Sequence, residues 1–286
     1  MVPPGEEFKF EGLKPAFVSV VQQLVEWQND KSTPVLLWVV DEPRENPNPW
    51  NRNLKDTIAY ADLAHKVPGA QVMVTPMGDE NSGVDYMPLL DHLDVVSTHP
   101  TKHSTKMIKR AMDDPKLGLH IYNAGRDRLS NGFYIWRVGA TGKFEWHFCQ
   151  WVHDPKGYRG REMFNPFLQY EGDDTFMPVP LSYKGGILPR EGIITMSIGI
   201  NDYRYVATLE QELAKAKSAP AKAALVAEIE KYMTDVKAMI PVTPDVKGYG
   251  SSGDLADVGA GIEGDITRKM DEIRRKMADY IVQLQK

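Results

Sequence analysis

Two adjacent carboxylates, Asp41 and Glu42, give the strongest chemical signal in this sequence. They come directly after six consecutive apolar residues, 35–40, and before Pro43. Carboxylates are unfavourable beside a buried strand unless they have partners, so this placement favours a catalytic site over simple packing. In such a site a carboxyl group can transfer a proton or stabilise a developing positive charge. The structural alternative is that Asp41 caps a loop and Glu42 pairs with Arg44.

Further polar and aromatic residues lie at or just after the ends of later predicted strands. A carbohydrate pocket combines aromatic rings that stack on sugars with a few polar groups that orient hydroxyls. We therefore expect the substrate-binding residues to be His99, Tyr122, Asn123, Arg126 and Trp146. The alternative is that Tyr122 and Trp146 fill the interior of the fold and that His99 caps a turn.

Arginines and histidines near this set suggest two further kinds of site. Arg126 and Arg128 suit a clamp for an anionic substrate group, with surface pairing to Asp127 or to glutamates as the alternative. His99 and His103 have a spacing that could bind a metal on a helix, but Pro100 follows the first and a third ligand is not evident. We expect neither a metal nor a cofactor.

The elements that must position these residues alternate between strand and helix. The continuous apolar run 35–40 indicates a strand buried on both faces, as in a parallel sheet covered by helices. Alternating strands and helices predict an α/β fold. The predicted order is helix 15–27, strand 35–40, helix 54–65, strand 71–75, helix 86–92, strand 94–98, helix 104–112, strand 118–122, segment 132–138 and strand 143–148.

About five such units are visible, whereas a closed (β/α)8 TIM barrel needs eight. We therefore expect the C-terminal part of such a barrel, in which the carboxyl ends of the strands face the active site. The first strand should then have an unpaired edge unless a missing N-terminal segment or another subunit covers it. An open doubly wound sheet is the alternative, but the glycine fingerprint of its dinucleotide-binding form is absent.

The C-terminal part of the sequence is predicted to be helical. We expect a barrel portion with mouth loops over residues 1–200 and a helical region over residues 201–286. Helices over 203–217 and 221–239 should form a hairpin, because Pro220 prevents one continuous helix. A last helix follows Asp265, and its buried face should consist of Ile266, Met270, Ile273, Met277, Tyr280 and Leu284.

Composition excludes several classes of function. The chain has 286 residues, with 42% hydrophobic and 26% charged residues, as in ordinary globular proteins. A net charge of -5 and the lack of a basic stripe argue against nucleic acid as a partner. We expect no membrane span, because apolar runs of about 18 residues are absent. Cys149 is the single cysteine, so an internal disulfide is excluded.

The order of several motifs resembles glycoside hydrolase family 123 and the wider group of barrel proteins called domain of unknown function 4091. The resemblance covers about residues 35–210. It rests on the ordered set Asp41-Glu42-Pro43, Gly132-Phe-Tyr-Ile-Trp136, Gly142-Lys-Phe-Glu-Trp146, Asp173-Asp174 and the segment from Ile193 to Tyr205. The segment from Asn201 to Arg204 differs from the usual family sequence, and the family's N-terminal β-sandwich and early barrel strands are not visible.

The resemblance implies a retaining β-N-acetylgalactosaminidase that uses the substrate's own acetamido oxygen as nucleophile. It implies that Glu42 is the general acid/base and that Asp41 orients the acetamido group. It also implies a secreted or periplasmic location, although residues 1–10 lack the pattern of a signal peptide. Adjacent carboxylates fit this chemistry, since an ordinary glycosidase needs two carboxylates roughly 5–9.5 Å apart on either side of the bond.

Two other functions are compatible with the sequence. One is a carbohydrate-binding or scaffold barrel that has no catalytic activity. The other is an ordinary two-carboxylate glycosidase on a different sugar, in which Glu145 would act together with Glu42.

Overall fold

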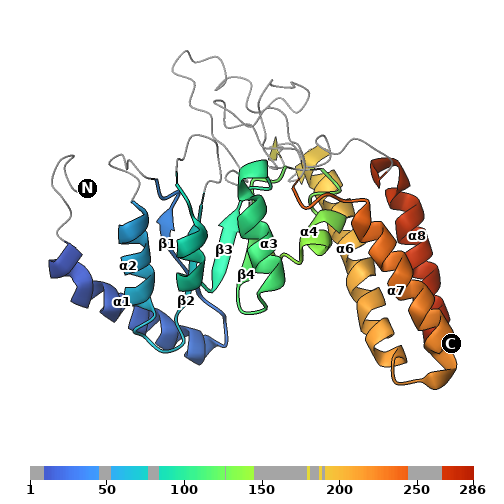
Figure 1. The fold of residues 1–286 in the computed structure, drawn as a ribbon, viewed down its shortest axis with the longest axis horizontal. Helices are drawn as coiled ribbons and strands as arrows, with labels where there is room; N and C mark the ends of the chain where they lie inside the picture. Colours follow the sequence, from blue (N-terminus) through green and yellow to red (C-terminus); the bar gives the residue numbers. More distant parts are fainter. Residues whose placement is uncertain are drawn as a thin grey trace, which may run out of the picture. The chain divides into compact units, whose positions relative to one another are not determined.

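The structure is a computed structural model that describes residues 10–44, 53–76, 84–125, 127–144, 179–180, 187–188, 191–243 and 266–286 (Figure 1). The chain divides into two compact units, Met1–Tyr122 and Asn123–Lys286. The first contains parallel strands that alternate with helices, and the second is mostly helical. The predicted α/β class is therefore confirmed.

A parallel sheet forms the centre of the first unit. Its order follows the chain, β1-β2-β3-β4-β5. The last strand, β5, is only three residues long, and its residues belong to the second unit. Each of the four strands of the first unit runs parallel to its neighbour. Their bounds are Leu36–Asp41 (β1), Gln71–Thr75 (β2), Val95–Thr98 (β3) and Gly118–Tyr122 (β4), close to the predicted strands.

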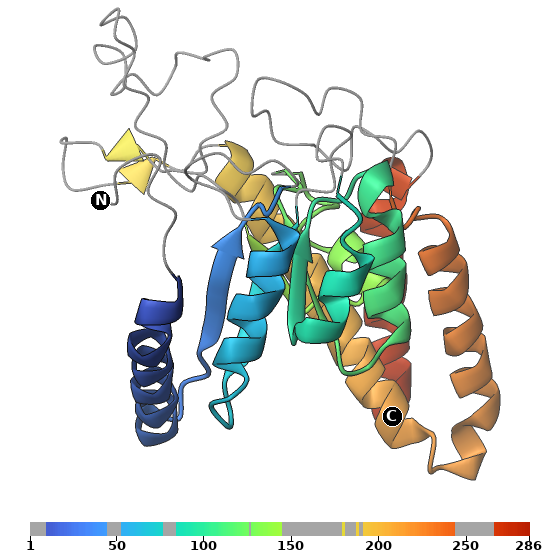
Figure 2. The ribbon, with the colours of Figure 1, turned by 60° about the vertical axis from the view of Figure 1, so that its left-hand side comes forward.

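Helical segments connect these strands, as expected for parallel pairing. Figure 2 shows α2, η1 and α3 along one face of the sheet. Asn53 begins α2 by accepting a hydrogen bond from the backbone N–H of Asp56 at 2.7 Å. The bounds are Phe10–Lys31 (α1), Leu54–Ala64 (α2), Met87–His92 (η1), Lys102–Ser104 (η2) and Thr105–Asp113 (α3).

The first strand differs from the prediction in its burial. Among the described strands β1 pairs only with β2, so the expected free edge is confirmed for this part of the chain. The expectation that both faces of this strand are buried is wrong, because Trp38 is 45% exposed. An edge strand has a neighbour on one side only, so its apolar residues are covered less completely than those of β2, where Val72 and Val74 are fully buried.

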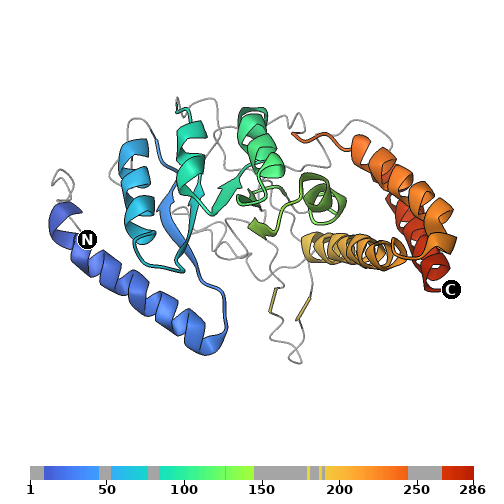
Figure 3. The ribbon, with the colours of Figure 1, turned by 60° about the horizontal axis from the view of Figure 1, so that its bottom comes forward.

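The second unit is built around helices α6, α7 and α8, which lie side by side (Figure 3). The predicted hairpin is present, with a 3-10 turn at Pro220 between α6 and α7. The first of these helices starts at Glu191, well before the predicted start at residue 203, and the expected boundary near residue 200 falls inside it. The bounds are Phe133–Val138 (α4), Gly142–Phe144 (β5), Val179–Pro180 (β6), Ile187–Leu188 (β7), Glu191–Ala216 (α6), Pro220–Lys222 (η3), Ala223–Ala238 (α7) and Ile266–Gln285 (α8).

The apolar stripe of the last helix is buried, as predicted from its spacing. All six predicted side chains are 7% exposed or less. This helix contacts α6 over much of its length and also touches α7. Tyr280 adds a polar contact, since its hydroxyl donates to Glu228 on α7 at 2.7 Å. The stripe is therefore a packing face of the helical bundle.

Two glycines allow the start of α4 to approach α6 closely. A Cβ atom added at Gly199 would lie 2.4 Å from the carbonyl oxygen of Arg128. One added at Gly132 would lie 2.7 Å from the carbonyl oxygen of Gly199. Both obstacles are backbone atoms, so neither contact can be relieved by turning a side chain. Glycine is required at these positions by space.

We predict that Gly199→Ala destabilises the second unit by about 1–3 kcal/mol, because the added methyl group forces the backbone of the neighbouring loop to move. The matched control is Gly12→Ala in α1, where an added Cβ meets nothing within 4 Å. Alanine has the higher helix propensity by up to about 1 kcal/mol, so the control should be neutral or stabilising. Thermal unfolding followed by circular dichroism measures both, and equal melting temperatures for the two variants would contradict the close approach.

Candidate active-site edge

The carboxyl end of β1 presents Asp41 in a fixed orientation. Asp41 lies opposite Thr75 in the register of β1 and β2. The Thr75 hydroxyl donates a hydrogen bond to Asp41 Oδ1 at 2.8 Å. Thr75 is buried whereas Asp41 is exposed, so a rigid group of the sheet holds a solvent-accessible carboxylate. Hydrogen bonding to one oxygen restricts the rotation of the carboxyl group and preorganises it.

The indole of Trp38 completes a short hydrogen-bond chain. Its Nε1–H lies 3.0 Å from Thr75 Oγ1 and 3.1 Å from the carbonyl oxygen of Val40. The Thr75 hydroxyl therefore accepts a hydrogen bond from Trp38 and donates one to Asp41. These two bonds use its single proton and one of its two acceptor positions. The half-exposed indole ring and the carboxylate thus share one contact residue. An exposed aromatic ring close to a carboxylate is a combination that sugar-binding sites use.

Glu42 adds one backbone hydrogen bond to the β1–β2 pairing beyond the end of β1, and the chain turns away from the sheet after it. Its backbone N–H donates to the carbonyl oxygen of Thr75 at 3.2 Å. Its φ of 45° lies in the left-handed region, which is uncommon for a residue with a side chain. Such conformations persist only where the surroundings impose them, and they concentrate at functional sites.

The side chain of Glu42 is 27% exposed and has an ionic partner. Its Oε2 lies 3.5 Å from Arg44 Nη2. This is the pairing expected under the structural interpretation of the acidic dipeptide.

The turn after β1 is fixed from a second direction by Tyr86. Its hydroxyl donates to the carbonyl oxygen of Pro43 at 2.6 Å, and the ring is 4% exposed. Tyr86 immediately precedes η1. The position of Glu42 therefore depends on a residue more than forty positions further along the chain.

His99 and Tyr122 lie at the ends of β3 and β4, as predicted, but both are buried. Their rings meet edge to face with centroids 4.7 Å apart, and they are 1% and 2% exposed. Burial of this degree matches the packing alternative that the sequence left open for Tyr122. Burial also lowers the pKa of His99 to about 3, because the charged imidazolium loses its hydration.

Of the other expected substrate-binding residues, the structure describes Asn123 alone. Asn123 belongs to the second unit, where it has a φ of 48° and donates its backbone N–H to the carbonyl oxygen of Phe144 at 2.9 Å. Arg126 and Trp146 lie outside the described residues, as does Glu145. Sequence reasoning did not single out Trp38 or Thr75, which the structure places in contact with one another and, through the hydroxyl, with Asp41.

Arg128 pairs with two aspartates that were not considered for it from the sequence, Asp202 and Asp271. Its guanidinium donates to both oxygens of Asp202, which is fully buried, and also to Asp271 at 2.8 Å. Arg274 donates to the same two aspartates. The pairing holds the pKa of Asp271 below its usual value and raises that of Arg128. This cluster connects the loop before α4 to α6 and α8, so its role is structural.

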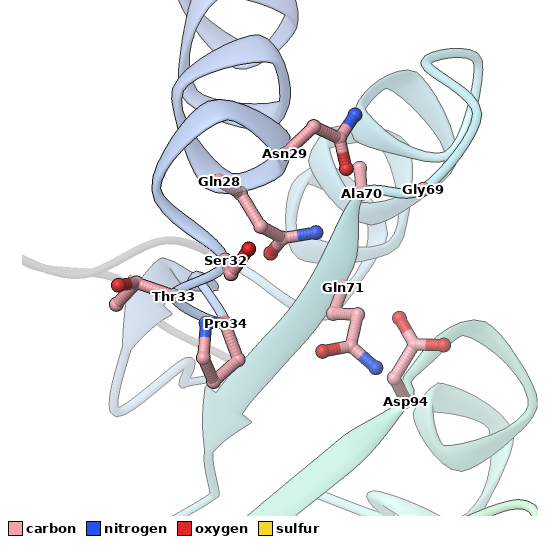
Figure 4. A pocket seen from close by; sticks show the side chains of 9 residues that line it. All are labelled: Gln28, Asn29, Ser32, Thr33, Pro34, Gly69, Ala70, Gln71 and Asp94. Carbon is pink, nitrogen blue, oxygen red and sulfur yellow. The ribbon is translucent and has the colours of Figure 1, made fainter.

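A polar cavity of about 620 Å³ lies at the opposite end of the strands (Figure 4). The end of α1 and the amino ends of β2 and β3 supply its walls. Gln28 and Asp94 in these walls accept hydrogen bonds from the backbone N–H groups of Val35 and Val72, at 2.6 and 2.7 Å. These polar groups therefore stabilise the connections at the amino ends of the strands, away from Asp41. The lining residues are Gln28, Asn29, Ser32, Thr33, Pro34, Gly69, Ala70, Gln71 and Asp94.

Neither the protein-family models nor the curated proteins include a match to this chain. Within the described ranges, histidine, cysteine, aspartate and glutamate side chains do not gather in groups of three that could hold a metal ion. Of the helices that the structure describes, none is both long and apolar enough to cross a membrane.

The buried His99 predicts a specific pH dependence of stability. Between about pH 6.5 and pH 3 the unfolded chain binds one proton that the folded chain does not, because the folded imidazole stays neutral. The contribution of the neutral His99 imidazole to the free energy of unfolding is therefore complete above pH 6.5 and is lost as the pH falls from 6.5 to about 3. The variant His99→Phe retains a ring against Tyr122. Between about pH 6 and pH 4 its free energy of unfolding should depend on pH less steeply than that of the wild type, by roughly 1.4 kcal/mol per pH unit.

Urea unfolding measured from pH 7 to pH 4 tests this prediction. The control is His103→Gln, which removes an exposed histidine from η2 instead of a buried one. Parallel curves for the wild type and His99→Phe would contradict a neutral, buried imidazole.

Proposed function

We propose that this protein is a glycoside hydrolase that cleaves a β-linked N-acetylhexosamine at the carboxyl edge of β1 and β2. The observation behind the proposal is the chain from Trp38 through Thr75 to Asp41, which places an oriented carboxylate beside a half-exposed indole ring. A sugar presents one apolar face to an aromatic ring and polar groups around its edge, so both kinds of contact are needed. The resemblance to family 123 supports the choice of an acetamido sugar.

Asp41 would act on the acetamido group. In a substrate-assisted reaction the acetamido oxygen attacks the anomeric carbon, and a positive charge develops on the five-membered ring that forms. An ionised carboxylate accepts the hydrogen bond from the acetamido N–H and stabilises that charge. The hydrogen bond from Thr75 fixes the carboxylate before the substrate arrives, which avoids reorganisation during the reaction.

Glu42 would protonate the oxygen of the leaving group. This role requires a carboxyl that can reach the leaving oxygen, whereas Glu42 Oε2 lies 3.5 Å from Arg44 Nη2. The proposal therefore includes a step in which the bound sugar separates Glu42 from Arg44. The pair is partly exposed, so little free energy opposes its separation.

The same ion pair favours one competing function. If Glu42 stays paired with Arg44, it does not reach the leaving oxygen, and the site would then bind a sugar without cleaving it. Saturable binding of an N-acetylhexosaminide without hydrolysis, unchanged by Glu42→Gln, would select the binding protein over the hydrolase.

We predict different effects for the two carboxylates. Asp41→Asn should slow hydrolysis of every N-acetylhexosaminide by about 10²–10³-fold, because the charge on the reacting acetamido group loses its counter-ion. Glu42→Gln should slow substrates with poor leaving groups by about 10²–10⁴-fold and affect activated aryl glycosides much less. Steady-state kinetics on a panel of aryl and alkyl glycosides measures both. If either folded variant cleaves an unactivated substrate at the wild-type rate, this pair is not catalytic.

The role of Thr75 predicts a further effect on catalysis. Thr75→Val keeps the shape of the side chain but removes the hydroxyl that orients Asp41, so kcat should fall about tenfold while KM changes little. The matched control is Thr57→Val in α2, because Thr57 is equally buried and its hydroxyl donates only to the carbonyl oxygen of Asn53. Equal loss of activity in both variants would show that the effect comes from stability.

A further inference from the structure

Helix α1 carries an apolar stripe that faces solvent. Leu13, Val20, Leu24 and Trp27 are between 36% and 55% exposed. At 3.6 residues per turn these four residues fall within an arc of about 60°. The charged residues between positions 13 and 27, Lys14 and Glu26, lie outside that arc. The stripe is thus continuous over about four turns of the helix.

This stripe borders the face that α1 already uses. Phe17 contacts Tyr60 of α2 with ring centroids 5.5 Å apart, and Val21 is 2% exposed. The centre of the exposed stripe lies about 110° around the helix from the side on which Val21 and Val25 lie, and Phe17 lies between the two. The helix therefore has one packed apolar face and one uncovered apolar face. Large exposed apolar patches are typical of interaction sites.

The strand next to this helix also has an edge without a partner strand among the described residues. Among the described strands β1 pairs only with β2, and its sequence Leu-Leu-Trp-Val-Val contains no charged residue or proline before Asp41. Natural edge strands are commonly protected from further pairing by charges or proline. The pairing of β1 with β2 is irregular between Trp38 and Val40, which leaves residues 36–38 as a regular edge. Figure 2 shows α1 next to β1, at the end of the first unit away from β4.

We infer that this helix and this strand edge form a two-fold symmetric interface with a second copy of the chain. A two-fold axis perpendicular to the sheet turns β1 antiparallel to its symmetry mate, which is a permitted pairing for edge strands. The same axis turns α1 antiparallel to its mate on the same side of the sheet. A second copy of the chain would thus cover the α1 stripe and the β1 edge at the same time.

The spacing of the stripe matches this symmetry. Val20 lies midway between Leu13 and Trp27, seven residues from each. In an antiparallel pair with the axis beside Val20, this residue meets its own copy and Leu13 meets Trp27 of the other copy. The smallest of the three side chains lies at the axis, and leucine is matched with tryptophan at each end. The stripe is therefore complementary to itself when one copy is reversed.

The expected interface area decides which contacts are needed. Four partly exposed side chains on each copy bury roughly 700 Å² in total, which is less than the about 1,000 Å² expected of a stable interface. Pairing of the two β1 edges adds backbone hydrogen bonds and the side chains of Leu36 and Leu37, which brings the total to about 1,000 Å². The dimer thus requires the helix stripe and the strand edge together.

Analytical ultracentrifugation of the full chain at about 5–100 µM tests the inference. The wild type should sediment as a dimer, and Val20→Glu combined with Leu24→Glu should sediment as a monomer with an unchanged circular dichroism spectrum. The matched control is Val282→Glu on α8, where valine is 51% exposed but lies outside the interface. It should remain dimeric. A monomeric wild type, or a double variant that is still dimeric, would overturn the inference.

Oxidative cross-linking tests the direction of the helices even if the charged variant fails to fold. In a Cys149→Ser background, Val20→Cys should form a disulfide-linked dimer. Leu13→Cys and Trp27→Cys should cross-link efficiently only when the two proteins are mixed. Efficient linkage of Leu13→Cys to itself would indicate parallel helices and overturn the two-fold arrangement, as would the absence of linkage through Val20→Cys.

Discussion

The parallel pairing of β1 with β2 is the interaction on which the candidate site depends. This register sets Thr75 opposite Asp41, and the same two residues then share a side-chain hydrogen bond. A slip of one residue would point the threonine side chain to the other face and leave the carboxylate without its partner. The backbone of Glu42 adds one more bond to Thr75, so both carboxylates take their positions from a single residue of the neighbouring strand. The geometry of the candidate site is a consequence of strand register.

Much of the fold follows from the sequence because the underlying signals are local. Apolar runs of four to six residues between turn residues marked the strands, and the order of strands and helices indicated parallel pairing. The predicted buried stripe of the last helix is correct for the same reason, since the spacing of Met270 and Met277 follows the period of the helix. The start of α6 was missed. Residues 191–202 contain glycine and β-branched residues that weaken the helical signal, and their packing against α4 is a tertiary effect.

The candidate site was predictable only in part. Asp41 and Glu42 are visible as carboxylates after an apolar run, but Trp38 lies three positions before Asp41, where regular alternation would place it on the opposite face. The register shift between Trp38 and Val40 brings the indole to Thr75, and that irregularity has no clear signature in the sequence. The burial of His99 was likewise not evident, because a histidine at a strand end can face either solvent or core.

The hydrogen bond from Tyr86 to the carbonyl oxygen of Pro43 limits how this protein can be altered. Loops at the carboxyl ends of parallel strands are usually treated as exchangeable modules, because each one is connected only to its own strand and helix. Here the loop after β1 is fastened to the residue that precedes η1. A segment transplanted after Asp41 would have to bring a backbone carbonyl to the place of the Pro43 oxygen to keep this buried hydrogen bond. Redesign of this edge would therefore have to treat both segments as one unit.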